Sequence, residues 1–97
     1  MISHIVLLRL EDGLSRQQTE DFLTVARNLL GAIPGVRNLR VGSTLRDDGS
    51  HPLALVMDFE NSEALEAYQV HPEHQRFLRE VIGPIVADKQ VLDFECP

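Results

Sequence analysis

The sequence contains a single cysteine, Cys96, which lies next to the last residue. One cysteine cannot form a disulfide within the chain, so the sequence is unlike the small secreted domains that depend on disulfides for stability. We interpret this thiol as an incidental group at a fraying chain end rather than as a nucleophile.

Long apolar runs are also missing. The longest is LALVM at residues 53–57, far short of the roughly 20 apolar residues that a membrane-spanning helix needs. Apolar residues begin at Ile2 and leave no room for the basic start of a signal peptide. We therefore expect a soluble cytoplasmic protein without a membrane partner.

Basic residues are few, with nine Lys and Arg against fifteen Asp and Glu, and the net charge is −6. This balance would repel a phosphate backbone, and the arginines are scattered rather than gathered into a basic face. The glycines occupy turn and cap positions, and none forms a glycine-rich phosphate loop. We therefore expect no nucleic-acid partner.

The remaining composition is that of one folded domain. The 97 residues are 43% hydrophobic and 25% charged, which suits a single compact domain over 1–97. Alternating or continuous apolar runs predict strands at 2–10, 36–45, 52–60 and 89–95.

Two helical segments separate these strands. Ser15 and Gln18 have the spacing of a capping box, which predicts a first helix over 16–30. Gly31 is expected to cap that helix in the left-handed conformation. The residues Asp-Asp-Gly-Ser at 47–50 predict a hairpin loop between the second and third strands.

The second helical segment contains a break. A short helix over 62–69 is expected to end at His71, because the residue before a proline avoids the α-helical region. Pro72 suits the first position of a new helix, which makes His71 the N-cap residue. Gly83-Pro84 is expected to weaken the far end of this new helix.

The resulting order, β-α-β-β-α(α)-β, predicts an α+β fold of the ferredoxin-like type, with a four-stranded antiparallel sheet and helices on one face. Those helices would cover only one face, yet Ile5, Leu7 and Val56 belong to strands that are apolar on both faces. The uncovered face predicts a homodimer, in which two sheets meet and close an α/β barrel.

The motifs of the chain resemble those of the stress-responsive dimeric α/β-barrel domain family. The most specific matches are EALEAYQVHPEH at 63–74 and VADKQVLDFE at 86–95, and the opening IxHIVLLRL, IPGV at 33–36 and LALVMDFE at 53–60 add to them. The resemblance implies a homodimeric barrel. The family includes plant stress-induced proteins, bacterial proteins without known activity, and polyketide cyclases that use no cofactor.

The resemblance also implies roles for three residues. In the cyclase members, a tyrosine and a histidine placed like Tyr68 and His74 act on the substrate, and a first-strand histidine at the position of His4 lines the same pocket. Tyr68 and His74 are therefore the candidate catalytic residues, and His4 is a candidate substrate-binding residue. His71, which the resemblance does not assign, is a second candidate substrate-binding residue.

Each of these residues also has a purely structural interpretation. His74 falls in the first turn of its helix, where the helix dipole and burial favour a neutral imidazole that can accept a proton. It could equally bond backbone or Tyr68 and tie two helices together. Tyr68 could polarise a carbonyl oxygen, or it could be a core tyrosine. His4 on an apolar face could be an ordinary core residue.

Metal binding is the weaker interpretation of the histidines. His71 and His74 have i, i+3 spacing, but Pro72 makes His71 a cap residue that faces off the helix, and the acidic residues show no ligand spacing. We expect no metal and no cofactor. His51 precedes a proline in a loop and is expected to be solvated.

Two functions therefore remain open. The first is a homodimeric domain of unassigned activity that binds a small apolar or aromatic molecule in a cleft lined by His4, Tyr68 and His74. The alternative is a cofactor-free, cyclase-like enzyme with His74 as the base and Tyr68 as the group that orients a carbonyl.

Overall fold

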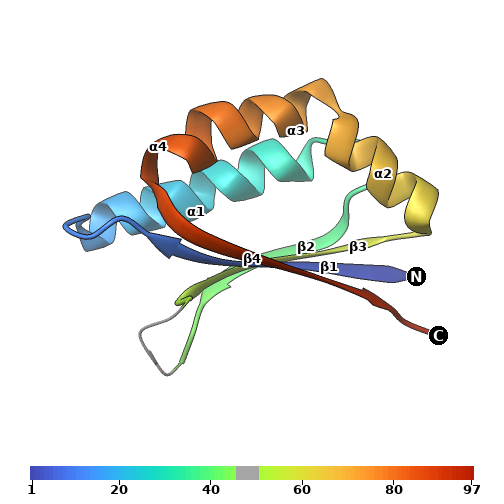
Figure 1. Cartoon of the computed structure of the whole chain (residues 1–97), viewed down its shortest axis with the longest axis horizontal. Helices are drawn as coiled ribbons and strands as arrows, with labels where there is room; N and C mark the ends of the chain where they lie inside the picture. Colours follow the sequence, from blue (N-terminus) through green and yellow to red (C-terminus); the bar gives the residue numbers. More distant parts are fainter. Residues whose placement is uncertain (46–50) are drawn as a thin grey trace.

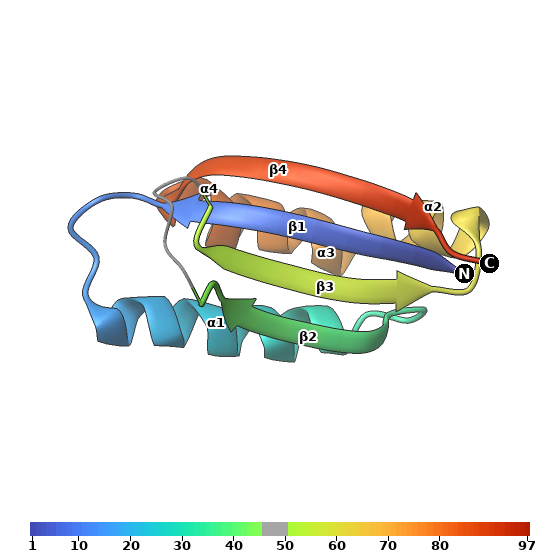
Figure 2. The same ribbon diagram turned by 90° about the horizontal axis from the view of Figure 1, so that it is seen from below.

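The computed structural model describes residues 1–45 and 51–97, so the hairpin loop predicted at 47–50 lies outside the described residues. Figures 1 and 2 show a single layer of helices on one face of a twisted four-stranded sheet. The elements are β1 (Ile2–Leu10), α1 (Arg16–Gly31), β2 (Arg37–Ser43), β3 (Leu53–Phe59), α2 (Ser62–Val70), α3 (Pro72–Phe77), the π-helical turn η1 (Leu78–Ile82), α4 (Gly83–Ile85) and β4 (Val86–Glu95).

The strands lie in the order β2-β3-β1-β4, and every neighbouring pair is antiparallel. With helices joining β1 to β2 and β3 to β4, this is the ferredoxin-like α+β arrangement, and the predicted fold class is confirmed. None of the helices in the described part of the chain is long and apolar enough to cross a membrane.

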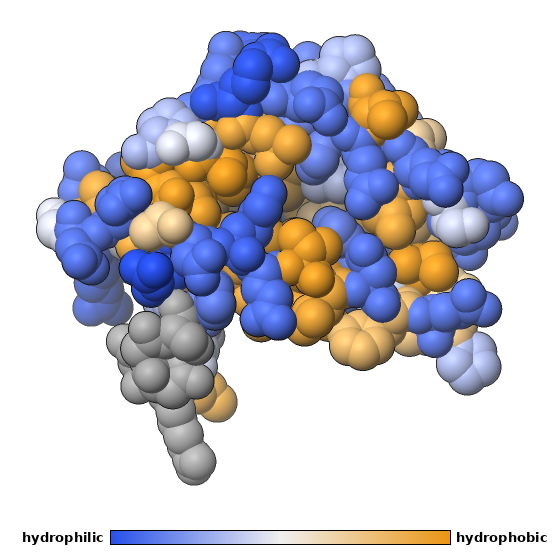
Figure 3. Space-filling model, viewed as in Figure 1, coloured by the Kyte–Doolittle hydropathy of each residue, from blue (hydrophilic) through white to orange (hydrophobic). Residues whose placement is uncertain are grey.

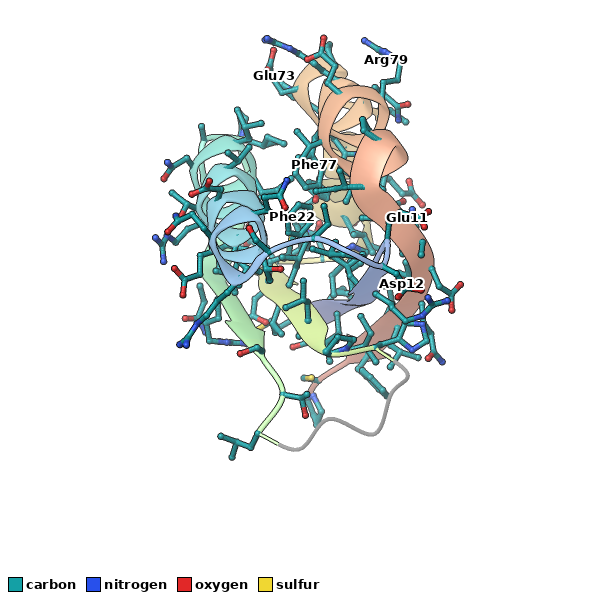
Figure 4. All side chains as sticks on the ribbon, turned by 90° about the vertical axis from the view of Figure 1, so that its left-hand side faces the viewer. Glu11, Asp12, Phe22, Glu73, Phe77 and Arg79 are labelled. Atoms are coloured by element: carbon teal, nitrogen blue, oxygen red, sulfur yellow. The ribbon has the colours of Figure 1, made fainter. Side chains whose placement is uncertain are left out.

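The hydrophobic core lies between the helices and one face of the sheet. Alternation along β1 turns His4, Val6 and Leu8 toward the helices, and all three are buried. Figure 4 shows Phe22 of α1 and Phe77 of α3 pointing into this interior, whereas Glu73 and Arg79 point outward. The most enclosed large side chains are Leu8, Leu30, Leu55, Met57 and Phe59.

The opposite face of the sheet carries apolar side chains that no helix covers. Ile5 of β1 lies opposite Val56 of β3 and Leu92 of β4, and all three are only partly buried. Phe94 of β4 is 51% exposed. Figure 3 shows apolar surface interrupting the hydrophilic surface along the β4 side of the molecule. We call Ile5, Leu7, Val56, Leu92 and Phe94 the open-face patch.

The start of α1 confirms the predicted capping box, and its end does not follow the prediction. The Ser15 side chain accepts from the Gln18 amide, and Gln18 Oε1 accepts from the Ser15 amide. Gly31 is the last helical residue rather than a left-handed cap, and the C-cap is Ala32 with a right-handed φ of −87°. The Ala32 amide bonds to Leu30 O, and the left-handed turn is made at Gly35 instead, with φ of 92°.

The second helical segment breaks where predicted. His71 has extended backbone angles, Pro72 occupies the first turn of α3, and His71 is the N-cap. Further along, the Gly83 amide bonds to Leu78 O, five residues back, which widens the helix into η1 just before Pro84.

The last strand begins three residues earlier than predicted, at Val86 rather than at Lys89. The chain passes directly from α4 into the sheet, because the Glu11 amide donates to Ile85 O at 2.8 Å and fixes the end of α4 beside the end of β1. This longer β4 places Lys89 well inside a strand that pairs with β1.

Candidate functional site

A cavity of about 150 Å³ lies between the helices and the strands β1, β3 and β4. Its walls are mostly apolar, with Val6, Leu30, Leu55, Phe77, Leu78, Ile82 and Val91. Its polar lining consists of His4, Tyr68, Gln69, His74 and Lys89. A mostly apolar cavity with a few convergent polar groups is typical of a small-molecule site.

His4 enters this cavity from the centre of the sheet. Its neighbour across the β1–β4 ladder is Asp93, and the two side chains are bonded through His4 Nδ1 and Asp93 Oδ1. The His4 side chain is almost fully buried, whereas Asp93 reaches solvent. Because a carboxylate accepts, His4 Nδ1 is the donor and the ring is held in one orientation.

Tyr68 of α2 lies between the two histidines. Its ring centroid is 4.4 Å from that of His74 and 5.9 Å from that of His4. Phe59 supports it from the core, with centroids 5.0 Å apart. Tyr68 is 2% exposed, and this burial raises the pKa of its hydroxyl, which keeps the group protonated and able to donate.

The Tyr68 hydroxyl is open to the cavity. It makes no hydrogen bond with a residue that the structure describes. In the described ranges, every fully enclosed side-chain polar atom has a hydrogen-bond partner, so this hydroxyl is not fully enclosed. The hydroxyl therefore reaches the cavity space, where a bound molecule can accept its proton.

His74 is positioned by the break between α2 and α3. Because α2 ends at Val70, the carbonyl of Gln69 has no partner further along that helix. It accepts instead from His74 Nδ1 at 3.0 Å and from Gln75 Nε2 at 2.7 Å. Since a carbonyl only accepts, His74 Nδ1 carries the proton, and Nε2 is left as the acceptor of the neutral ring.

The surroundings of His74 favour that neutral ring. Burial is the largest influence that lowers its pKa, and the charges of His4 and Lys89 lower the pKa further, while the bond to Gln69 raises it. The bond to Gln69 ties α3 to α2, as the structural interpretation predicts. The same bond leaves Nε2 free, so the structural and the chemical interpretations are compatible.

The pH dependence of His74 is a direct test of this environment. In an NMR titration of the histidines, we expect the His74 ring to take up its proton at a pH below 6.5, which is the ordinary pKa of histidine. As pH falls below about 6.5, the unfolded chain binds this proton before the folded one, so the contribution of His74 to stability is present above that pH and is lost on acidification. A titration midpoint for His74 at or above that of the same histidine in the urea-unfolded chain would contradict this geometry.

The structure does not bring His71 to the cavity. Its Nδ1 accepts from the Glu73 amide at 3.1 Å, which is the capping bond of α3, and it is not among the cavity-lining residues. In residues 1–45 and 51–97, no three His, Cys, Asp or Glu side chains are grouped to hold a metal ion.

His51 is not simply solvated, and that expectation is wrong. Its Nε2 lies 2.8 Å from Asp88 Oδ2, and its side chain is 17% exposed. The bond to His51 is the largest influence that lowers the pKa of Asp88. This pair lies outside the cavity lining and joins the segment just before β3 to β4.

Sequence reasoning missed two polar residues of the cavity, Gln69 and Lys89, and the partner of His4, Asp93. Alternation within the predicted strand 89–95 already puts Lys89, Val91 and Asp93 on one face, but only the β1–β4 register shows that this is the face that His4 shares. Gln69 was not predictable from side-chain type, since its backbone carbonyl does the positioning.

A second hollow, of about 290 Å³, lies between α1 and the η1–α4 segment. It is larger than the first cavity but contains no histidine or tyrosine, and its polar groups are Gln18, Asp21 and Glu80. By volume alone, this groove would be the better candidate for a binding site. The first cavity is the better candidate because it combines acid–base side chains with enclosure.

Comparison with known proteins identifies the family. The family model for the stress responsive A/B barrel domain (Dabb) matches residues 2–96. The chain therefore belongs to the stress-responsive α/β-barrel domain family, and the resemblance of its motifs is confirmed.

Two solved structures and one characterised relative are similar to the chain. A Dabb family protein with a ferredoxin-like fold from Mesorhizobium loti has a TM-score of 0.90 and 25% identity, covering 99% of this chain and 96% of that one. A dimeric ferredoxin-like protein of unknown function from Thermobifida fusca has a TM-score of 0.82 and 33% identity, covering 98% and 90%. Olivetolic acid cyclase from Cannabis sativa is 26% identical over 80 residues, which is 78% of each chain.

Proposed function

We propose that the protein is a homodimer that binds a small apolar or aromatic molecule in the cavity lined by His4, Tyr68 and His74. The dimeric state of the Thermobifida fusca relative supports the homodimer, and so does the open-face patch, which is apolar and uncovered in a single chain. The proposed dimer uses the face of the sheet opposite the helices, so it leaves the cavity accessible.

The observation that carries the proposal is the row of rings inside an apolar cavity. Tyr68 stands between His4 and His74 at centroid distances of 5.9 and 4.4 Å. An apolar cavity of about 150 Å³ is large enough to admit a benzene-sized ring. A planar molecule could pack against the aliphatic wall while its polar edge meets the tyrosine hydroxyl and the free imidazole nitrogen.

The alternative function is cofactor-free acid–base chemistry. Two observations favour it: the similarity to olivetolic acid cyclase, and the tautomer that the Gln69 carbonyl imposes on His74. His74 Nε2 would remove a proton from a carbon next to a carbonyl, while the Tyr68 hydroxyl donates to that carbonyl oxygen. The resulting carbanion would attack a second carbonyl of the same molecule, and the imidazolium would return its proton to the new alkoxide.

Binding can be tested through Tyr68 itself. The chain has one tyrosine and no tryptophan, so its tyrosine fluorescence reports on this cavity. We expect small aromatic compounds such as benzoate or benzamide to change that fluorescence saturably and to raise the thermal midpoint. His74→Gln should weaken benzamide binding about ten-fold or more, because the imidazole Nε2 that accepts from the amide N–H is replaced by a side chain of different length and geometry. Its free energy of unfolding should stay within about 1 kcal/mol of the wild type.

The matched control is His51→Gln, which removes an imidazole outside the cavity. It should bind the same compounds as the wild type does. Equal binding by the two variants, or no saturable change with any compound, would contradict the proposed site.

The acid–base alternative has its own measurement. In D₂O, the protein should accelerate deuterium exchange at the carbon between the two carbonyls of acetylacetone, and His74→Gln should remove the acceleration while His51→Gln retains it. If deuterium exchange in the presence of the wild type proceeds at the uncatalysed rate, the protein does not carry out this chemistry, and only the binding function remains.

A further inference from the structure

We propose that the cavity selects an anionic ligand, a small aromatic carboxylate, with the Lys89 ammonium group binding the carboxylate at the cavity edge. This inference rests on the proposed function of the same cavity and names the class of molecule that it takes. It starts from one residue, since Lys89 is the only lysine in the chain and it lines this cavity.

The strand register places Lys89 on the cavity side of β4. Lys89 lies opposite Leu8, Val91 opposite Val6, and Asp93 opposite His4, so alternate residues of β4 follow the buried face of β1. Lys89 and Asp93 are four residues apart, which is about 13 Å along a strand. Lys89 therefore lies at the end of the cavity that is farther from the His4–Asp93 pair. The apolar wall of the cavity lies between Lys89 and that pair.

The neighbouring carboxylates on β4 are already engaged, which leaves the ammonium group available. Asp88 is bonded to His51 at 2.8 Å, and Asp93 is bonded to His4. Lys89 forms no ion pair with any residue in the described ranges, although acidic residues outnumber basic ones by fifteen to nine. A ligand carboxylate would supply the counter-charge that this chain does not.

An exposed lysine on an edge strand has an ordinary explanation, which is protection against pairing with another strand. Two observations set Lys89 apart from that explanation. It is one of the residues that line the cavity, and its charge is among the smaller influences that lower the pKa of His74, on another wall of the same cavity. A carboxylate bound beside Lys89 would accept from its ammonium group.

The test compares benzoate with benzamide, which has the same shape and no charge. Tyr68 fluorescence or calorimetry would give both dissociation constants for the wild type and for Lys89→Met, which keeps the apolar stem of the side chain. We expect the wild type to prefer benzoate by about ten- to a hundred-fold, as a charge-assisted hydrogen bond provides. Lys89→Met should lose this preference through weaker benzoate binding, while benzamide binding is unchanged.

Two controls keep the result specific. Arg79→Met removes the same charge from a side chain that points away from the interior (Figure 4), and it should retain the preference. Lys89→Arg restores the charge and should retain it as well, whatever Lys89→Met does to folding. Equal binding of benzoate and benzamide to the wild type, or an unchanged preference in Lys89→Met, would overturn the anionic ligand while leaving the cavity as a binding site. If neither compound binds the wild type, both the inference and the proposed function fail.

Discussion

Val56→Lys is expected to convert the proposed dimer into a folded monomer. Val56 lies near the middle of the open-face patch, opposite Ile5 of β1. In the proposed dimer, an ammonium group at this position would be buried without a partner in both subunits. A loss of about 3 kcal/mol in the free energy of association already raises the dissociation constant of the dimer about a hundred-fold. Sedimentation equilibrium over a range of concentrations measures this change.

Val70→Lys is the matched control for this variant. It makes the same substitution on α2, at a position that is 74% exposed and on the helical side of the molecule. We expect it to remain dimeric. A Val56→Lys protein that dimerises as tightly as the control would show that the subunits meet elsewhere, and a wild type that stays monomeric at every concentration would refute the homodimer itself.

Phe59→Ala is expected to cost about 3–5 kcal/mol of unfolding free energy, because it removes a large side chain from the core and leaves a cavity. Phe59 is completely buried at the end of β3. Its ring centroid lies 5.0 Å from that of Tyr68 and 6.2 Å from that of His4. A domain of this size has roughly 5–15 kcal/mol to lose. Urea unfolding monitored by circular dichroism gives the difference.

The same substitution should also weaken ligand binding, since Tyr68 and His4 lose the ring that holds them in place. Val70→Ala is the control, because truncation of an exposed valine should change stability by less than about 0.5 kcal/mol. A Phe59→Ala protein within about 1 kcal/mol of the wild type would mean that this region of the core repacks freely, and the positioning of Tyr68 would need another explanation.

The sequence predicted the elements that depend on local chemistry. Ser15 with Gln18 located the start of α1, and His71 with Pro72 located the break between α2 and α3, because each signal involves bonds between near neighbours. The end of α1 was misplaced at Gly31. A glycine permits a left-handed cap without requiring one, and Gly35 makes that turn instead.

The site was predictable only in part. The types of His4, Tyr68 and His74 were visible, but their convergence was implied by the family resemblance rather than by spacing. What could not be predicted depends on pairing between distant strands. Asp93 meets His4 from 89 residues away, and Lys89 reaches the cavity only through the β1–β4 register. His51 was assigned to solvent for the same reason, since its partner Asp88 is 37 residues away.

The central claim is that the cavity beneath α2 and α3 takes up a small molecule. A ¹H–¹⁵N NMR titration of the protein with benzoate tests it most directly. We expect saturable shifts concentrated at Tyr68, Gln69, His74 and Lys89 and absent from the groove between α1 and α4. Shifts confined to that groove, or changes that never saturate, would contradict the claim.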